Sequence, residues 1–186
     1  MIAIHVTRNL AFVTMAETDR NQLLHAARTF CEAFSYKKDV DVVLDLFSKT
    51  RALSIIEYGE PSLAPFIGRR FEGSFIRKYF EIIGELLDYD SGSLRFPEYI
   101  VDTETRKVFV RGQGRFTWKS TGESWDESFA YALDFDDELK VTDYKVWADS
   151  GAAYLARIGK LNDVRQEIKQ VGEWPSSFNH NPMLNF

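Results

Sequence analysis

The run Ile56-Glu57-Tyr58-Gly59 places a carboxyl group beside a phenol at the end of a short apolar segment. If Glu57 is buried, its pKa rises because burial disfavours the charged form, and it can then exchange protons near neutral pH. The phenol of Tyr58 can donate a hydrogen bond to an oxygen that gains negative charge during a reaction. Two plainer roles stay open: Glu57 faces water or pairs with an arginine, and Tyr58 packs in the core.

A second carboxyl group, that of Asp149, follows Trp147 at the end of a later β-rich segment. Their spacing places both side chains on one face of the strand, if the strand runs that far. Asp149 is therefore a second candidate for moving a proton, with Trp147 as an apolar wall. The alternative is that Asp149 caps a helix from Ser150 onward, since aspartate is favoured at helix N-termini.

Aromatic residues are frequent, with 15 Phe, 8 Tyr and 4 Trp among 186 residues. Aromatic side chains bury large areas, and Tyr and Trp add a polar tip, which suits the wall of a pocket. We expect six of them to contact a ligand: Tyr58, Tyr79, Tyr99, Phe129, Tyr131 and Trp147. A dense core without a cavity would use the same residues.

Strand alternation over residues 125–135 separates two kinds of side chain. One face carries Glu127, Phe129, Tyr131, Leu133 and Phe135. We expect this face to meet helices and a pocket. The opposite face carries Ser128, Ala130, Ala132 and Asp134, and this small, flat surface suits contact with a second copy of the chain.

The sequence lacks the residue patterns of metal, dinucleotide and calcium sites. Metal sites require clustered His or Cys, whereas the chain has three scattered His and one Cys, Cys31, which we expect to be a buried, inert thiol. Gly112-Gln113-Gly114 lacks the third glycine of a dinucleotide-binding turn. The acidic residues at 134–138 lack calcium-loop spacing and predict a solvated hairpin turn. We expect no metal and no cofactor.

Charge and hydropathy narrow the partners and the compartment. The net charge is -5, and basic residues are interspersed with acids, so we expect no nucleic-acid partner. No run of about 18 apolar residues occurs, so we expect no membrane partner. A single cysteine favours a reducing, cytoplasmic setting.

The elements that must position these residues follow from periodicity. Thr18 and Asp19 are N-cap candidates for a first helix, Asp39 caps a short second one, and residues 75–87 form a third. Segments of period two predict strands at 53–58, 94–101, 107–118, 125–135 and 141–147. Helices followed by a strand meander predict an α+β fold, with helices on one face of an antiparallel sheet.

We expect three regions along the chain. Residues 1–17 form a loosely packed leader, residues 18–158 form a single domain, and residues 159–186 form a C-terminal helix and tail. The tail has Pro175, Pro182 and several Asn and Ser.

Two stretches carry a resemblance to a known family. They are Phe71-Glu72-Gly73-Ser74-Phe75-Ile76-Arg77-Lys78-Tyr79-Phe80 and Lys140-Val141-Thr142-Asp143-Tyr144-Lys145-Val146-Trp147-Ala148-Asp149-Ser150. Over about residues 19–157 the chain resembles the nuclear-transport-factor-two-like superfamily, its SnoaL-like branch, and especially fungal SnoaL-like proteins of unknown role. The resemblance implies a cone-shaped fold, with a curved antiparallel sheet wrapped on three N-terminal helices, and a homodimer through the outer sheet face.

The sequence departs from the catalytic patterns of this superfamily at two points. Steroid isomerases carry an aspartate as general base at about the place of Glu57 and Tyr58, and neither residue is an aspartate. Members that resemble scytalone dehydratase use pocket histidines. The one histidine within the domain, His25, is expected to be a surface or packing residue.

Three functions remain open. The first is a cofactor-free lyase or isomerase that acts on a hydrophobic carbonyl compound, with Glu57 or Asp149 as proton carrier and aromatic walls. The second is a module that binds a small apolar ligand without changing it. The third is a dimerising interaction protein whose cone is filled by side chains.

Overall fold

The computed structural model describes the backbone of residues 3–170 and the side chains of residues 17–169. The predicted leader at 1–17 and the tail beyond residue 170 therefore lie mostly or wholly outside the residues whose side chains are described. No helix in the described part of the chain combines the length and hydropathy that crossing a bilayer requires.

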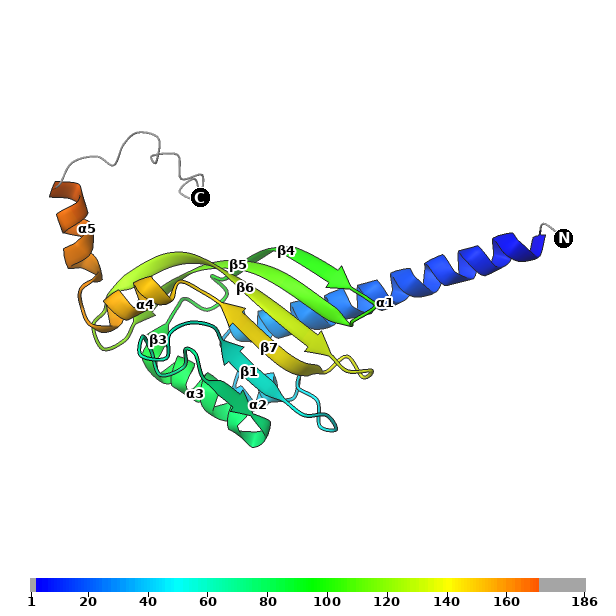
Figure 1. Ribbon diagram of the computed structural model, residues 1–186, viewed down its shortest axis with the longest axis horizontal. Helices are drawn as coiled ribbons and strands as arrows, with labels where there is room; N and C mark the ends of the chain where they lie inside the picture. The colour runs from blue at the N-terminus through cyan, green and yellow to red at the C-terminus, as the bar shows by residue number, and fades with distance from the viewer. Residues whose placement is uncertain (1–2, 171–186) are drawn as a thin grey trace.

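Helix α1 (Ala3–Ser35) is longer than predicted, since it begins well before Thr18 and Asp19. The sequence contains no Pro or Gly over this span, so nothing interrupts the helix. Its N-terminal part projects beyond the sheet (Figure 1). Its second half packs into the core through Leu23, Ala27 and Phe30, none of which is exposed.

The next two helices lie close to their predicted positions. In α2 (Val40–Leu44), the Asp39 carboxylate accepts a hydrogen bond from the Asp41 N–H at 2.9 Å, which confirms the predicted cap. A short 3-10 turn (Gly73–Phe75) leads into α3 (Ile76–Leu86). The residues that α3 buries follow helical spacing: Ile76, Tyr79, Phe80 and Ile83.

A seven-stranded, strongly curved sheet wraps around these helices (Figure 1). Its strands are β1 (Ser54–Glu57), β2 (Arg70–Glu72), β3 (Leu87–Asp88), β4 (Arg95–Asp102), β5 (Lys107–Trp118), β6 (Ser124–Phe135) and β7 (Val141–Trp147). The order is β2-β1-β7-β6-β5-β3, and β4 also pairs with β5. The predicted α+β class is confirmed.

The prediction of a purely antiparallel sheet is wrong at one place. Strand β1 runs parallel to β7, with Glu57 opposite Val146. The chain between them passes through α3 and the rest of the sheet, so β1 and β7 are not joined by a hairpin. Strands β2 and β3 were not predicted, because two or three residues give no measurable periodicity.

The register of β6 confirms the predicted alternation. Phe129, Tyr131, Leu133 and Phe135 are all at most 6% exposed on the inner face. Tyr131 pairs with Val110 of β5 and with Val146 of β7, and Glu57 lies one strand further. Glu57 and Tyr131 therefore share the inner side of one row across the sheet.

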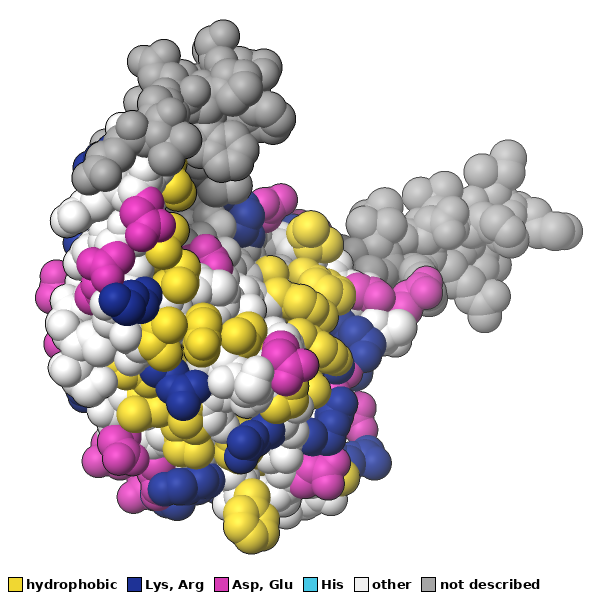
Figure 2. All heavy atoms as spheres, turned by 60° about the vertical axis from the view of Figure 1, so that its left-hand side comes forward, with side chains coloured by type: hydrophobic (Ala, Val, Ile, Leu, Met, Phe, Trp, Pro, Cys, Tyr) yellow, Lys and Arg dark blue, Asp and Glu magenta, His cyan; other side chains and the backbone are white. Residues whose placement is uncertain are grey.

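Two helices close the chain. In α4 (Ser150–Arg157), the N-cap is Asp149. The Glu123 carboxylate caps the first turn of helix α5 (Leu161–Gln170). It accepts hydrogen bonds from the backbone N–H of Leu161 at 2.9 Å and of Asn162 at 3.2 Å. At this end of the molecule, hydrophobic, basic and acidic side chains are interspersed over the visible surface (Figure 2).

Gly112 of β5 leaves room for an aromatic ring. A Cβ atom there would lie 2.0 Å from the ring of Phe129 on β6. We predict that Gly112→Ala lowers the free energy of unfolding by about 1–3 kcal/mol, since the buried ring must move. Gly84→Ala is the matched control, because a Cβ on this helical glycine meets nothing within 4 Å, and it should be neutral or stabilising. Urea denaturation measures both, and equal effects would contradict this reading of the packing.

Candidate active site

A small, partly open cavity lies between the inner face of the sheet, α3 and the start of α4. Its volume is about 40 Å³. A cavity of this size holds only a few water molecules. The side chains that line it are mostly aromatic or aliphatic: Phe34, Phe66, Tyr79, Ile83, Leu87, Phe116, Trp125, Phe129, Tyr131, Tyr144, Val146, Ala148 and Ala153, with Glu57, Glu127 and Asp149 as the acids.

Glu57 is the buried acid of this cavity. It is 6% exposed, and the Tyr79 hydroxyl donates a hydrogen bond to its Oε2 at 2.8 Å. Burial raises the pKa of Glu57 to about 8; the Tyr79 bond opposes this rise and the charge of Glu127 adds to it. At pH 7 the Glu57 carboxyl is therefore mostly protonated. Oε1 has no hydrogen-bond partner among the described residues.

Glu127, on the inner face of β6, is the second acid. Its Oε2 accepts from the Trp125 Nε1–H at 2.9 Å and from the Asp149 backbone N–H at 3.0 Å. Burial raises the pKa of Glu127, and these two donors oppose the rise. Its Oε1 takes no bond from any side chain or backbone group described, so one carboxylate oxygen remains available to the cavity.

Asp149 has the capping role that the sequence offered as the alternative. Its Oδ1 accepts from the Ala152 N–H at 2.9 Å at the start of α4. The residue also lines the cavity, and its backbone N–H holds Glu127. Asp149 therefore fixes the helix start and orients the neighbouring acid at once.

Two tyrosines form the opposite polar wall. The hydroxyls of Tyr131 and Tyr144 hydrogen-bond to each other, and their rings pack edge to face with centroids 5.0 Å apart. Burial raises the pKa of both phenols well above its ordinary value. Both tyrosines are therefore neutral and act only through hydrogen bonds.

The structure brings together five of the eight predicted site residues: Glu57, Asp149, Tyr79, Phe129 and Tyr131. Tyr58 and Trp147 do not line the cavity. They stack on each other with centroids 4.8 Å apart and are 38% and 41% exposed. Each follows an inward residue on its strand, Glu57 or Val146, and alternation turns it outward. The expectation that Trp147 and Asp149 both line the pocket is therefore wrong, because only Asp149 lines the cavity.

Tyr99 also lies away from the cavity. It packs against α1, where the Arg28 guanidinium lies 5.5 Å from its ring centroid and the Tyr99 hydroxyl donates to the Cys31 sulfur. Cys31 is fully buried, and burial raises the pKa of its thiol to about 12. The expected inert thiol agrees with this environment.

Most of the residues that line the cavity were not among the predicted site residues, and four of them are aromatic or acidic residues on the sheet: Phe116, Trp125, Glu127 and Tyr144. Two of them carried a usable signal. Glu127 lies on the predicted inward face of its strand, and Tyr144 alternates with outward Asp143 and Lys145 on β7. The partners of Glu127 depend on the turn into α4, for which strand periodicity gives no information.

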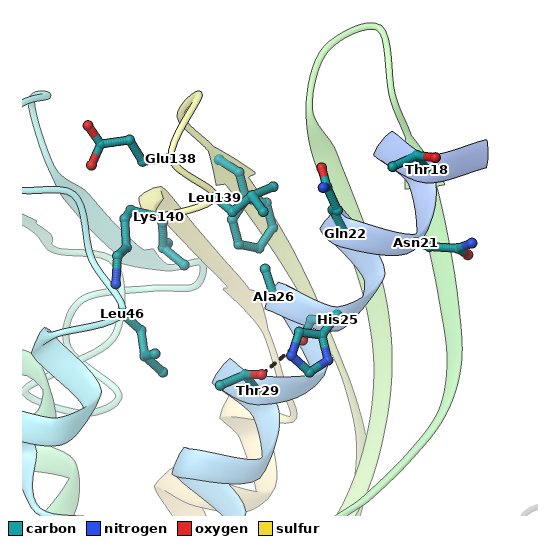
Figure 3. A pocket seen from close by; sticks show the side chains of 12 residues that line it. Thr18, Asn21, Gln22, His25, Ala26, Thr29, Leu46, Glu138, Leu139 and Lys140 are labelled. Atoms are coloured by element: carbon teal, nitrogen blue, oxygen red, sulfur yellow. Dashed lines mark hydrogen bonds between the residues drawn. The ribbon is translucent and has the colours of Figure 1, made fainter. Parts of the chain in front are cut away.

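A larger, open groove of about 560 Å³ lies between α1 and the β6–β7 turn (Figure 3). His25 lies on its rim and is exposed, as expected for a surface residue. Its backbone carbonyl accepts a bond from Thr29 at 3.0 Å. No buried acid lines this groove, so proton-transfer chemistry points to the smaller cavity instead. Among residues 17–169, no group of three or more His, Cys, Asp or Glu could hold a metal ion.

Comparison with known proteins identifies the fold. No family model matches this chain, and no curated protein matches it by sequence. Solved structures do match. A protein described as an isomerase from Bacillus subtilis has a TM-score of 0.63 and 16% identity, over 76% of this chain and 96% of its own.

Two further solved structures have a similar fold. An NTF2-like protein from Burkholderia xenovorans LB400 has a TM-score of 0.58 and 19% identity, over 74% of this chain and 97% of its own. A protein described as a SnoaL-like polyketide cyclase from Jannaschia sp. CCS1 has a TM-score of 0.56 and 14% identity, over 74% and 92%. The chain has the nuclear-transport-factor-two-like cone fold, as the sequence resemblance implied.

The raised pKa of Glu57 predicts how stability depends on pH. The folded state holds the proton up to about pH 8, whereas the unfolded state releases it near 4.5. The resulting stabilisation is fully present below pH 4.5 and is lost as the pH rises to about 8, by up to about 1.4 kcal/mol per pH unit. Glu57→Gln mimics the protonated form and should flatten this slope in urea unfolding between pH 5 and 8. Identical slopes in both proteins would mean that Glu57 is ionised in the fold.

Proposed function

We propose that this protein is a cofactor-free lyase or isomerase that acts on a small carbonyl compound, with Glu57 as general acid and Glu127 as general base. The observation that carries the proposal is the buried, Tyr79-bonded carboxyl of Glu57 in a cavity that also contains a second acid. Two acids in different environments can divide the two roles, since one keeps its proton and the other gives it up more readily. The fold is one that holds small molecules, which agrees with this proposal.

The proposed reaction passes through an enol intermediate. Glu127 takes a proton from the carbon beside the carbonyl, and the electron pair of that C–H bond forms the C=C bond. Glu57 gives its proton to the carbonyl oxygen through Oε1, while the Tyr79 bond steadies its Oε2. Glu57 takes back the enol O–H proton as the C=O bond re-forms. If Glu127 then gives its proton to the γ-carbon of a conjugated enol, the result is isomerisation, and if it gives that proton to a departing β-substituent, the result is elimination. Asp149 positions Glu127 through its backbone N–H.

A substrate must displace side chains in order to enter. The cavity of about 40 Å³ is too small for a ketone such as acetone or cyclopentanone. Phe129 and Tyr131 stack with centroids 4.9 Å apart on β6, and rotation of either ring would widen the cavity. The same filled state favours the second candidate, a dimerising interaction protein whose cone is filled by its own side chains.

We predict that the protein accelerates exchange of α-hydrogens for deuterium in acetone and cyclopentanone, two small ketones, in D2O near pH 7. Glu57→Gln and Glu127→Gln should each reduce the enzymatic rate about 100-fold or more, the usual contribution of a positioned acid or base. ¹H NMR measures the exchange directly.

The matched control is Glu98→Gln, because Glu98 pairs with Arg111 at the surface, away from the cavity. It should leave the rate unchanged. The pH profile should fall above about pH 8, as Glu57 loses its proton. An exchange rate that is the same in Glu57→Gln as in the wild type would rule out Glu57 as the acid and favour non-catalytic binding.

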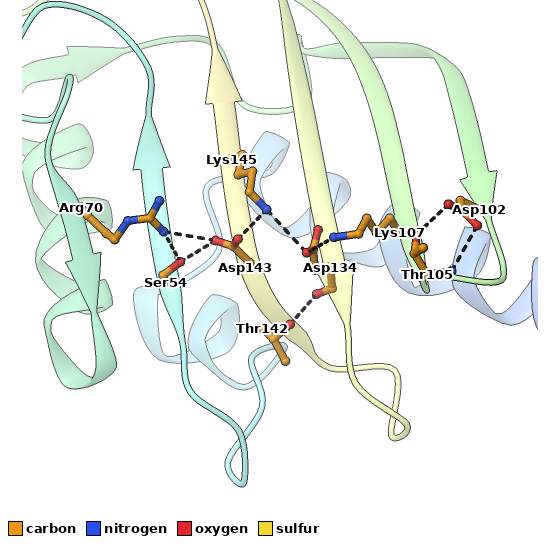
Figure 4. Close-up of polar contacts among 9 residues, drawn as sticks. All are labelled: Ser54, Arg70, Asp102, Thr105, Lys107, Asp134, Thr142, Asp143 and Lys145. Carbon is orange, nitrogen blue, oxygen red and sulfur yellow. Dashed lines mark hydrogen bonds and ion pairs between the residues drawn. The ribbon is translucent and has the colours of Figure 1, made fainter.

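We also propose that two copies pair through the outer face of the sheet. At its centre, Ala130 lies between Arg111 of β5 and Trp147 of β7, beside a shallow depression. Trp and Arg around a small residue are typical of an interface centre. Nearby charges pair across the strands: Asp134 contacts Lys107 at 2.5 Å and Lys145 at 3.5 Å (Figure 4). Covering this face would therefore leave few charges unpaired.

Ala130→Glu should convert a dimer into a monomer, since it places a large charged side chain at the centre of the contact, where only a methyl group fits. Sedimentation velocity at micromolar concentration distinguishes the two states. The control, Ala52→Glu, makes the same chemical change at an exposed loop position and should leave the dimer intact. A wild-type protein that sediments as a monomer would contradict the pairing.

A further inference from the structure

The cavity lining contains acidic side chains and no basic ones among the described residues. Three acids line it, Glu57, Glu127 and Asp149, and no Lys, Arg or His is found among its lining residues in the described part of the chain. An anionic ligand would meet repulsion there with no compensating donor cation. A positively charged ligand would meet attraction from every ionised group in the wall.

The aromatic wall adds to the same preference. Phe116 contacts both Trp125 and Phe129 with ring centroids 6.0 Å apart, and Phe129 stacks on Tyr131. The faces of aromatic rings carry partial negative charge and attract cations, most strongly where water is excluded. A wall of this kind accepts neutral ligands as well but gives no advantage to an anion.

We propose that the cavity selects organic cations, such as ammonium compounds, over neutral and anionic molecules of the same shape. The proposal rests on the function proposed above and specifies the class of ligand for the same site. In that reaction, the positive charge would be a fixed charge of the substrate, away from the carbonyl group.

The Oε1 atoms of two carboxyl groups are available to such a ligand, and the Glu57 group becomes charged when a bound cation favours loss of its proton. Glu57 is 6% exposed and uses only Oε2, for Tyr79. Glu127 uses only Oε2, for Trp125 and Asp149. Both Oε1 atoms lack a hydrogen-bond partner among residues 17–169. Burial without a neighbouring cation raises the pKa of both acids, and a bound ammonium group would supply the missing positive charge.

Three probes of equal shape and different charge test this preference. They are choline, its neutral carbon analogue 3,3-dimethylbutan-1-ol, and the anion 3,3-dimethylbutanoate. Each is larger than the cavity, so each must move the same side chains, and the cost of opening cancels in the comparison. Ligand-observed NMR titration at pH 7.5 gives the three dissociation constants.

We expect choline to bind at least tenfold more tightly than the alcohol, and the alcohol more tightly than the anion. Glu127→Gln keeps the acceptor for Trp125 and Asp149 but removes the charge. It should lower the preference for choline at least threefold and leave the affinity for the alcohol unchanged. Glu98→Gln, at the surface, should change neither.

Equal affinities for the three probes, or tightest binding of the anion, would overturn the proposal. Loss of choline binding together with alcohol binding in Glu127→Gln would also overturn it, because that result indicates a disturbed pocket and no charge effect. The proposed catalysis fails separately: ketone exchange that does not depend on Glu57, with the choline preference intact, refutes the reaction and keeps the ligand class.

Discussion

Burial of the Glu57 carboxyl is the constraint on which the rest of the site depends. A charged carboxylate in this position would be costly, so the group stays protonated and takes one hydrogen bond from Tyr79. That bond requires α3 to present Tyr79 toward the sheet and β1 to end beside β7. Strand β1 pairs with β7 in parallel, whereas the other paired strands are antiparallel. This pairing therefore places Glu57 on the inner face of the sheet, beside the cavity.

The aromatic side chains both stabilise the fold and restrict the site. Tyr144 contacts Phe30, Tyr79 and Tyr131, so helix α1, helix α3 and the sheet meet at one ring. The same packing leaves only about 40 Å³ beside the two glutamates. Stability and access are thus opposed in this cone. A ligand gains entry only by moving rings that the core uses, and its contacts with the two acids must offset that cost.

Much of the fold could be predicted from the sequence, because the long strands have a clear period of two. Strands β5 and β7 begin and end where predicted, and the inward face of β6 was identified correctly. The site was predicted less completely. Tyr58 and Trp147 lie one residue beyond inward neighbours, so a small uncertainty in strand ends placed them on the wrong face. The role of Glu127 depends on Trp125 and on the Asp149 backbone, contacts that no periodicity reveals.

The protonation state of Glu57 is the central claim, and ¹³C NMR of the glutamate side-chain carboxyl carbons tests it most directly. Glu57→Gln identifies the resonance by its disappearance, and a titration from pH 4 to 10 gives the midpoint. The account predicts a carboxyl that stays protonated through neutral pH and titrates near 8. A midpoint near the ordinary value of 4.5 would show an ionised Glu57, and neither its role as acid nor the pH-dependent stability would then hold.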